Sequence, residues 1–219
     1  MEESAKTDHL SNSLTDLMTS LMVIFILLLL AFISHTASKD AAVADVLLKK
    51  LQKDLKIQGI DNERLKLDPR DKNVILVIVP GDLMRFETQK SDLRSEGRDW
   101  LDENIPKFSS ILCAAKYAPS VDSIVVEGHT DKQGWAGKPG VESENANLAL
   151  SQERSMAVVK EALHSLEARP QERDCFLEKL SAVGRGQRDP EPTDEESRRV
   201  IFRIRVKATN EQNIEKQLR

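Results

Sequence analysis

Two groups of residues in this sequence have the types and the spacing to do chemistry. The first is Asp16, at the start of a long apolar run, with Thr19 and Ser20 one turn further along. Helical spacing puts these polar residues on one face and aliphatic side chains on the rest. A carboxylate carried to mid-membrane costs about 2.5–3.5 kcal/mol, and such residues usually mark an ion pathway. Alternatively, Thr15 or Asp16 could cap the helix in the headgroup region, where an acid suits the helix dipole.

The second group lies far along the chain, around Asp131 and Arg154. Asp131 ends the run EGHTD after a predicted strand, and Arg154 belongs to NLALSQER, which opens a predicted helix. Both segments should meet at one edge of a sheet, where ligands often bind. Arg154 offers a planar fork for a carboxylate, and Ser151 starts a capping pattern. A ligand with both an ammonium and a carboxylate would be held at both ends, unless Asp131 and Arg154 pair with each other.

The first group requires a membrane helix, which we predict over residues 14–38. No residue from Leu17 to Ser38 is formally charged, and about 20 apolar residues suffice to span a bilayer. Residues 1–13 form a polar tail that is too acidic for a signal peptide, so we expect a retained anchor. The lysines that follow the span favour a cytoplasmic C-terminal side, although large domains can cross the membrane regardless of such charges.

Residues 39–72 are predicted to form a helical linker that could act as a plug. Val43, Leu47, Leu51 and Leu55 are spaced four apart and form one apolar stripe on a polar helix. Such a stripe requires a partner, either a second copy of the chain or the folded domain.

The second group requires a folded domain, which we predict over residues 73–208, with a C-terminal tail at 209–219. Apolar patterns predict strands at 74–80, 121–127, 180–183 and 199–206, and helices at 95–116 and 148–166. This alternation predicts an α+β fold, a βαβαββ-type sheet with helices packed on it.

Composition excludes several functions. The net charge is −4 and aromatic residues make up 4%, which argues against nucleic acid as a partner. The sequence shows no nucleophile–base pair and no metal-ligand spacing, so we expect no catalytic residue, no metal site, no cofactor and no enzyme activity. His129 is expected to be structural. Cys113 and Cys175 could form one disulfide outside the cytoplasm or remain two separate thiols.

Four motifs in residues 73–208 resemble the OmpA-like peptidoglycan-binding domain: VEGHTD at 126–131, NLALSQERS at 147–155, GRGQRDP at 184–190 and SRRVIFRI at 197–204. Phe86 and Leu93 also match the opening pattern of that family. The resemblance implies that Asp131 and Arg154 hold the diaminopimelate group of a peptidoglycan stem peptide, while Asn147 and Leu150 line the site. The segment Trp135–Ala146 is longer than usual, and Ala146 stands where the family often has an aromatic residue.

The run LTDLMTSLMVIFILLLL at 14–30 resembles the membrane motif of MotB-type stator subunits. In that family the aspartate that matches Asp16 binds the translocated ion, H⁺ or Na⁺, and Thr19 and Ser20 would line the pore. The resemblance implies a single-pass protein of the bacterial inner membrane, with a cytoplasmic N-terminus and a periplasmic C-terminal domain. It also implies a homodimer inside a ring of five MotA-like membrane subunits.

The acidic tail and short linker resemble the B subunits of Zorya anti-phage systems more than flagellar subunits. We therefore expect a peptidoglycan-anchored subunit that couples proton flow to movement of a membrane partner in anti-phage defence. A flagellar stator subunit and a passive peptidoglycan tether are the alternatives.

Overall fold

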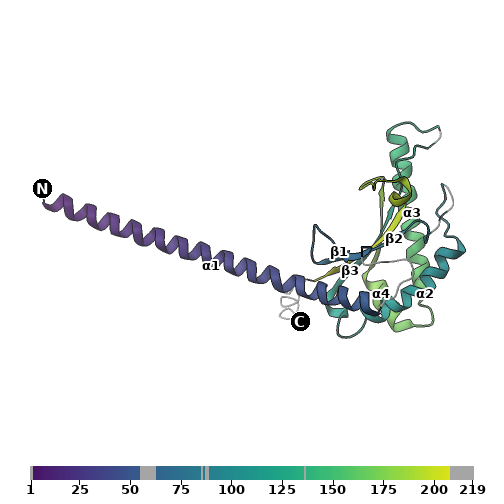
Figure 1. Ribbon diagram of the computed structural model, residues 1–219, viewed down its shortest axis with the longest axis horizontal. Helices are drawn as coiled ribbons and strands as arrows, with labels where there is room; N and C mark the ends of the chain where they lie inside the picture. The colour runs from purple at the N-terminus through teal and green to yellow at the C-terminus, as the bar shows by residue number, and fades with distance from the viewer. Residues whose placement is uncertain (1, 55–62, 85, 87–88, 136, 208–219) are drawn as a thin grey trace. The chain divides into compact units, whose positions relative to one another are not determined.

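The computed structural model describes residues 2–54, 63–84, 86, 89–135 and 137–207 (Figure 1). The chain divides into two compact units, Met1–Asp40 and Ala41–Arg219. The first helix, α1 (Glu2–Asp54), contributes to both units. The tail predicted at 209–219 and the stripe residue Leu55 lie outside the described residues.

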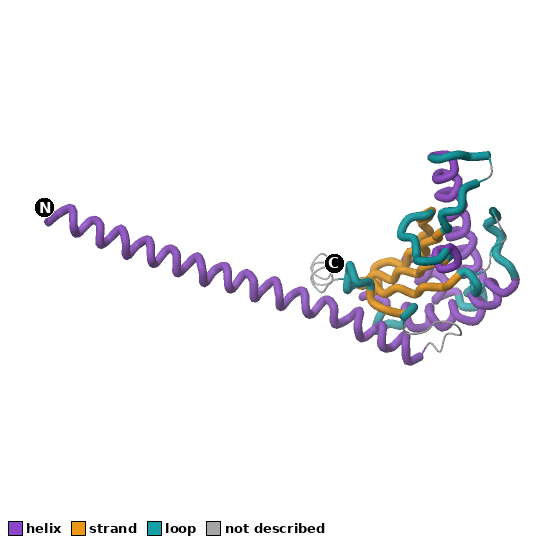
Figure 2. The backbone as a smooth tube through the Cα atoms, turned by 45° about the horizontal axis from the view of Figure 1, so that its top comes forward, coloured by secondary structure: helices purple, strands orange, loops and turns teal. Residues whose placement is uncertain are grey.

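The second unit is built on one mixed sheet with the strand order β1-β2-β5-β3-β4 (Figure 2). Its strands are β1 (Leu65–Leu67), β2 (Val74–Pro80), β3 (Val121–His129), β4 (Leu180–Gly186) and β5 (Arg199–Val206). The β3–β4 pair is parallel, and the β1–β2, β2–β5 and β3–β5 pairs are antiparallel. The parallel pair leaves the ends of β3 and β4 at the same edge, where Asp131 follows.

Helices α2 (Ser95–Leu112), α3 (Val141–His164) and α4 (Pro170–Lys179) pack on one face of the sheet, together with residues 44–51 of α1. The short α5 (Asp194–Ser197) precedes β5, and a 3₁₀ turn lies at Ala118–Ser120. Alternate β2 residues such as Ile75 and Val77 join the main core with helix residues such as Leu101 and Phe176. Residues of the opposite parity, Val74 and Leu76, form a small separate cluster. This alternation follows from the two-residue period of a strand.

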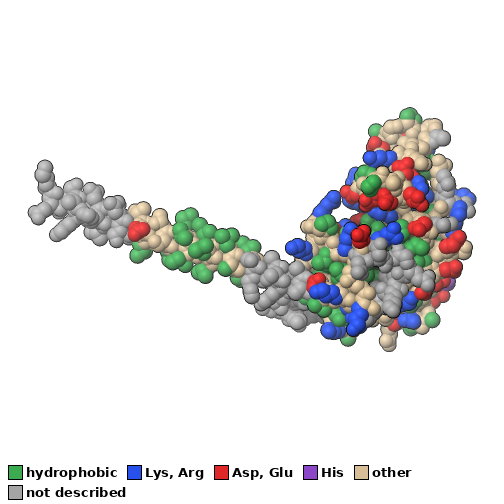
Figure 3. Space-filling view, viewed as in Figure 1, with side chains coloured by type: hydrophobic (Ala, Val, Ile, Leu, Met, Phe, Trp, Pro, Cys, Tyr) green, Lys and Arg blue, Asp and Glu red, His purple; other side chains and the backbone are tan. Residues whose placement is uncertain are grey.

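The first unit consists of the N-terminal part of α1. Among the described residues, one helical stretch, Thr15–Ile33, is long and apolar enough to cross a membrane. Figure 3 shows hydrophobic side chains along it, and within the described part of the chain none of its side chains is buried. Helix α1 includes residues 2–13, so this part of the predicted tail at 1–13 belongs to the same helix rather than to a separate segment.

The folded domain begins earlier than the predicted boundary at residue 73. Ala44, Leu47, Leu48 and Leu51 of α1 are buried in the main core of the second unit. Gln52 Nε2 also donates a hydrogen bond to the Leu65 carbonyl at 3.0 Å. The compact unit therefore starts at Ala41 and includes β1. Of the two partners considered for the apolar stripe, the folded domain is the one that covers it.

The predicted fold class is confirmed: one N-terminal apolar helix is followed by an α+β domain of βαβαββ type. The strands at 74–80 and 199–206 have the predicted bounds. The helix predicted at 148–166 begins at Val141, with Glu142 and Glu144 in its first turn, where acidic groups are favourable. Helix α4 was not predicted, because Phe176 is its one buried residue and its pattern is mostly polar.

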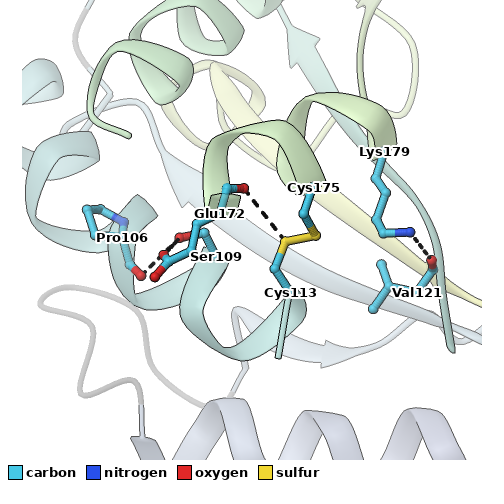
Figure 4. Close-up of a disulfide and its surroundings, with 7 residues drawn as sticks. All are labelled: Pro106, Ser109, Cys113, Val121, Glu172, Cys175 and Lys179. Carbon is cyan, nitrogen blue, oxygen red and sulfur yellow. Dashed lines mark hydrogen bonds between the residues drawn. A yellow bond between two sulfur atoms is a disulfide. The ribbon is translucent and has the colours of Figure 1, made fainter. Parts of the chain in front are cut away.

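The structure joins Cys113 and Cys175 in a disulfide, with their Cα atoms 6.1 Å apart (Figure 4). Cys113 follows the last residue of α2, and Cys175 lies in α4. Beside the bond, Ser109 Oγ donates to Glu172 Oε2 at 2.6 Å, which links the same two helices. The disulfide therefore fixes α4, which has little apolar surface, against α2.

Removing this disulfide is expected to lower the free energy of unfolding. The bond closes a loop with a sequence separation of 62, and the lost restraint on the unfolded chain corresponds to about 4 kcal/mol. Urea unfolding of the Cys113→Ala/Cys175→Ala double variant measures the effect. Ser110→Ala on the exposed side of α2 is the control and should change stability by less than about 0.5 kcal/mol. Equal stability of the double variant and the wild type would contradict the disulfide.

Candidate functional site

A pocket of about 360 Å³ opens where β3 ends and α3 passes over the sheet. It contains all four residues that the sequence analysis assigned to ligand binding. The residues that line it are Phe86, Gln89, Thr130, Asp131, Gln133, Gly134, Trp135, Asn147, Leu150, Arg154 and Arg198. Charged, amide and apolar groups therefore meet in one cavity.

The turn after β3 positions Asp131. Thr130 N donates to the Gly186 carbonyl at 2.9 Å, so the chain stays paired with the end of β4. Gln133 N then donates to Asp131 Oδ1 at 3.0 Å, which closes a turn around the carboxylate. The side chain of Asp131 is 12% exposed. The anion thus has a fixed position at the wall of the pocket.

One face of α3 supplies the opposite wall. Asn147, Leu150 and Arg154 follow the spacing i, i+3, i+7, and all three are buried. The prediction that Ser151 starts a capping pattern was wrong, because α3 begins ten residues earlier. Ser151 Oγ instead accepts a hydrogen bond from Gly186 N at 2.8 Å and joins the helix to β4.

Two glycines allow α3 to lie this close to the sheet. A Cβ on Gly128 would collide with the Ser151 carbonyl, and a Cβ on Gly184 would lie 2.6 Å from Gln152 N. Gly184 N also donates to Gln152 Oε1 at 2.6 Å. Gly184 is therefore a strand residue that lies against the helix backbone.

Gly128→Ala is expected to push α3 away from the sheet and to destabilise the domain. A collision with backbone atoms in a packed region typically costs about 1–3 kcal/mol. Urea unfolding measures this cost, and Gly134→Ala is the matched control because its Cβ would find its nearest neighbour, Ser143 Oγ, at 3.7 Å. Equal stability of the two variants would show that the close approach at Gly128 is unimportant.

Arg154 is held in place by the segment that contains Phe86 and Leu93. Arg154 Nε donates to the Lys90 carbonyl at 3.0 Å, and its guanidinium lies 5.0 Å from the centre of the Phe86 ring. Burial lowers the pKa of the Arg154 guanidinium, the Asp131 carboxylate opposes this shift, and the charge of Arg198 adds to it. A carboxylate bound here would offset the cost of burying the cation.

Asp131 has a different ionic partner from the one considered in the sequence analysis. Arg198 Nη1 donates to Asp131 Oδ2 at 2.6 Å, and among the described residues this is the ion pair found at Asp131. Arg198 was not among the site residues predicted from the sequence. The signal available was its place in SRRVIFRI, directly before β5.

Trp135 is a second pocket residue that sequence reasoning missed. Its indole Nε1 donates to Asn147 Oδ1 at 2.8 Å, and its backbone N donates to Ser143 Oγ at 2.8 Å. Lys138 Nζ lies 4.9 Å from the centre of the Trp135 ring. The unusually long segment Trp135–Ala146 thus gives the pocket an aromatic wall, and its last six residues form the start of α3.

The arrangement is suited to binding. The pocket combines one carboxylate, two guanidiniums, the Asn147 amide and apolar walls, so it can bind both an ammonium and a carboxylate of a ligand. Among the described residues, no group of three or more His, Cys, Asp or Glu could hold a metal ion. His129 is buried and does not line this pocket, and its Nδ1 lies 3.3 Å from the Arg188 carbonyl oxygen.

The second candidate group lies in the first unit. Asp16, Thr19 and Ser20 are exposed on α1, inside the stretch that could cross a membrane. Thr19 Oγ1 contacts the Thr15 and Asp16 carbonyls, each at 2.9 Å, so its hydroxyl can be satisfied within its own helix. Such back-bonding lets Thr19 remain polar in an apolar segment at little cost.

The chain is similar to a curated protein and to solved structures. It is 24% identical over 206 residues to the Zorya protein ZorB of Escherichia coli, covering 88% of this chain and 86% of ZorB. A MotB-like protein from Desulfovibrio vulgaris has a TM-score of 0.51 and 16% identity, covering 80% of this chain and 98% of its own. No family model matches the chain.

A periplasmic domain of MotB from Helicobacter pylori gives a similar result. Its TM-score is 0.50 at 18% identity, and the match covers 74% of this chain and 89% of that one. The two structural likenesses show that the chain shares the fold of MotB-like proteins. The similarity to ZorB and the shared fold agree with the resemblance that the sequence motifs predict.

Proposed function

We propose that this ZorB-like chain is the peptidoglycan-anchored subunit of an ion-driven stator complex in the bacterial inner membrane. The observation that supports this most is the pocket built from Asp131, Arg154 and Arg198 on a domain with the MotB fold. The same chain carries a membrane-length helix with Asp16 near its beginning. A wall-binding site and an intramembrane acid are both needed if ion flow is to move a partner.

The pocket would take the diaminopimelate end of a stem peptide. The carboxylate of that end would bind the buried Arg154 fork, and its ammonium would bind Asp131. Leu150 and the Trp135 ring would contact the methylene chain, and Asn147 would hold Trp135 in place through the bond at 2.8 Å.

Asp16 would bind and release the translocated ion at an interface with a MotA-like membrane subunit. Protonation removes its charge and changes how the interface packs, which would move the partner. The wall-bound domain would keep this subunit still. By resemblance the complex contains a dimer of this chain inside a ring of five partners, and it carries H⁺ or Na⁺.

The disulfide supports a periplasmic C-terminal domain. Disulfides persist in oxidising compartments such as the periplasm and are rare in the cytoplasm, so Cys113–Cys175 argues against the orientation favoured by the lysine count. The match to ZorB over most of both chains favours anti-phage defence over flagellar motility.

The proposal is tested by sedimentation of the full chain in detergent with purified peptidoglycan sacculi. The chain should pellet with sacculi that contain diaminopimelate and much less with sacculi that contain lysine, which lacks the second carboxylate. The lysine-type sacculi serve as the control for non-specific binding. Equal pelleting with both types, or none with either, would refute wall recognition through this pocket.

A further inference from the structure

The charges around the pocket exceed what a zwitterion needs. Of the described residues that line it, three carry formal charges at neutral pH: Asp131, Arg154 and Arg198. One carboxylate and one guanidinium match one ammonium and one carboxylate of a ligand. Arg198 is left over, which gives the pocket a net charge of +1. A ligand with a second carboxylate would balance it.

The backbone of Arg198 is fixed from both sides. Arg198 N donates to the Asp194 and Glu195 carbonyls at 3.2 Å each, which ends α5. On the other side Gly81 lies so close that a Cβ there would collide with the Arg198 carbonyl oxygen. The backbone therefore holds Arg198 at a defined position beside the pocket.

The side chain of Arg198 is less restrained than its backbone. It is 44% exposed, whereas its partner Asp131 is 12% exposed. When a ligand ammonium binds Asp131, the carboxylate is neutralised from a second side and attracts Arg198 less strongly. The exposed guanidinium can then contact an anion on the ligand at little cost, because it is already partly in water.

We propose that Arg198 binds a second carboxylate of the stem peptide, outside the zwitterionic end held by Asp131 and Arg154. This rests on the proposed function and specifies its substrate: a stem peptide whose carboxylate next to diaminopimelate is free rather than amidated. Two groups could supply it, namely the α-carboxylate of the preceding D-glutamate and the carboxylate of the following D-alanine. The Arg198 fork would bind either in bidentate geometry.

The test is calorimetric titration of the full chain in detergent with three synthetic tetrapeptides. One has all carboxylates free, one is amidated at D-glutamate, and one is amidated at D-alanine. Wild-type protein should lose at least about tenfold in affinity for one of the amidated peptides, as expected for a charge-assisted hydrogen bond. The peptide that loses affinity identifies the source of the carboxylate.

Arg198→Gln should bind the free peptide as weakly as wild type binds the sensitive amidated one, and it should not respond to that amidation. Arg198→Lys keeps the charge without the fork and should lie between the two. The matched control is Arg173→Gln, because Arg173 lies in α4 and does not line the pocket. This variant should bind all three peptides with the same affinities as wild type.

The outcomes separate this inference from the proposed function. Wild-type protein that binds none of the three peptides would refute the proposed function itself. Equal binding of all three peptides by wild type would overturn the role of Arg198 while leaving wall binding intact. This comparison uses the wild-type protein alone, so it does not depend on whether a variant folds. Tighter binding by Arg198→Gln would also overturn it, because Arg198 would then compete with the ligand for Asp131.

Discussion

Asp16→Asn is expected to abolish ion-driven activity while leaving the protein assembled in the membrane. Asparagine has nearly the same size and polarity, so the helix should still insert, but it cannot bind and release a proton. In cells that carry the neighbouring membrane partner, we expect phage protection to fall to the level of cells without this chain. Plaque counts measure protection, and co-purification of the partner measures assembly.

The matched control is Asp8→Asn, which makes the same charge change before the apolar run. It should keep full protection. Asp16→Glu retains an ionisable group and should keep part of the activity. Full protection by Asp16→Asn would reduce this chain to a passive tether, whereas failure to assemble would give Asp16, which lies inside α1, a structural role in the complex.

Arg154→Gln is expected to weaken binding of a diaminopimelate stem peptide by about 100-fold. The variant removes the buried guanidinium that receives the carboxylate, and loss of one partner of a buried charge-assisted contact costs about 2–5 kcal/mol. The guanidinium also contacts Phe86 and Lys90, so thermal unfolding must accompany the titration. Calorimetry with the free tetrapeptide measures the affinity.

Two further variants sharpen this result. Asp131→Asn should weaken binding by a similar factor, because it removes the anion that receives the ammonium. Arg169→Gln changes an arginine of the same domain that does not line the pocket, and it should leave affinity unchanged. If a folded Arg154→Gln protein binds as tightly as wild type, the ligand does not use this pocket.

The strands were the most predictable part of the fold. The β-branched residues of β2 and β5 favour a strand without help from the rest of the fold, and the predicted bounds of both strands match the structure. In contrast, β1 has three residues in a charged stretch and gains its stability from pairing with β2, so local sequence says little about it. The burial of Leu47 and Leu51 in the domain also depends on tertiary packing, and the helical stripe alone left the choice of partner open.

The candidate site was predictable where residues share one element. The spacing of Asn147, Leu150 and Arg154 places them on one helix face. Asp131 follows a strand that its apolar pattern predicts. Arg198 lies 67 residues from Asp131 along the chain, so only the folded chain brings it to the pocket. Trp135 follows Asp131 closely, but its contact with Asn147 depends on the path of the loop before α3. The sequence also left undecided whether Cys113 and Cys175 form a disulfide, because pairing depends on the distance between α2 and α4 in the folded chain.

The central claim is that Asp16 couples ion flow to a wall-anchored complex, and ion uptake into vesicles tests it most directly. Wild-type chain and Asp16→Asn would each be reconstituted with the MotA-like partner, and uptake of H⁺ and Na⁺ would be followed with ion-sensitive dyes under an imposed membrane potential. We predict uptake of one of the two ions by the wild-type complex and none by the variant. Equal uptake by both complexes, or uptake by neither, would contradict the account.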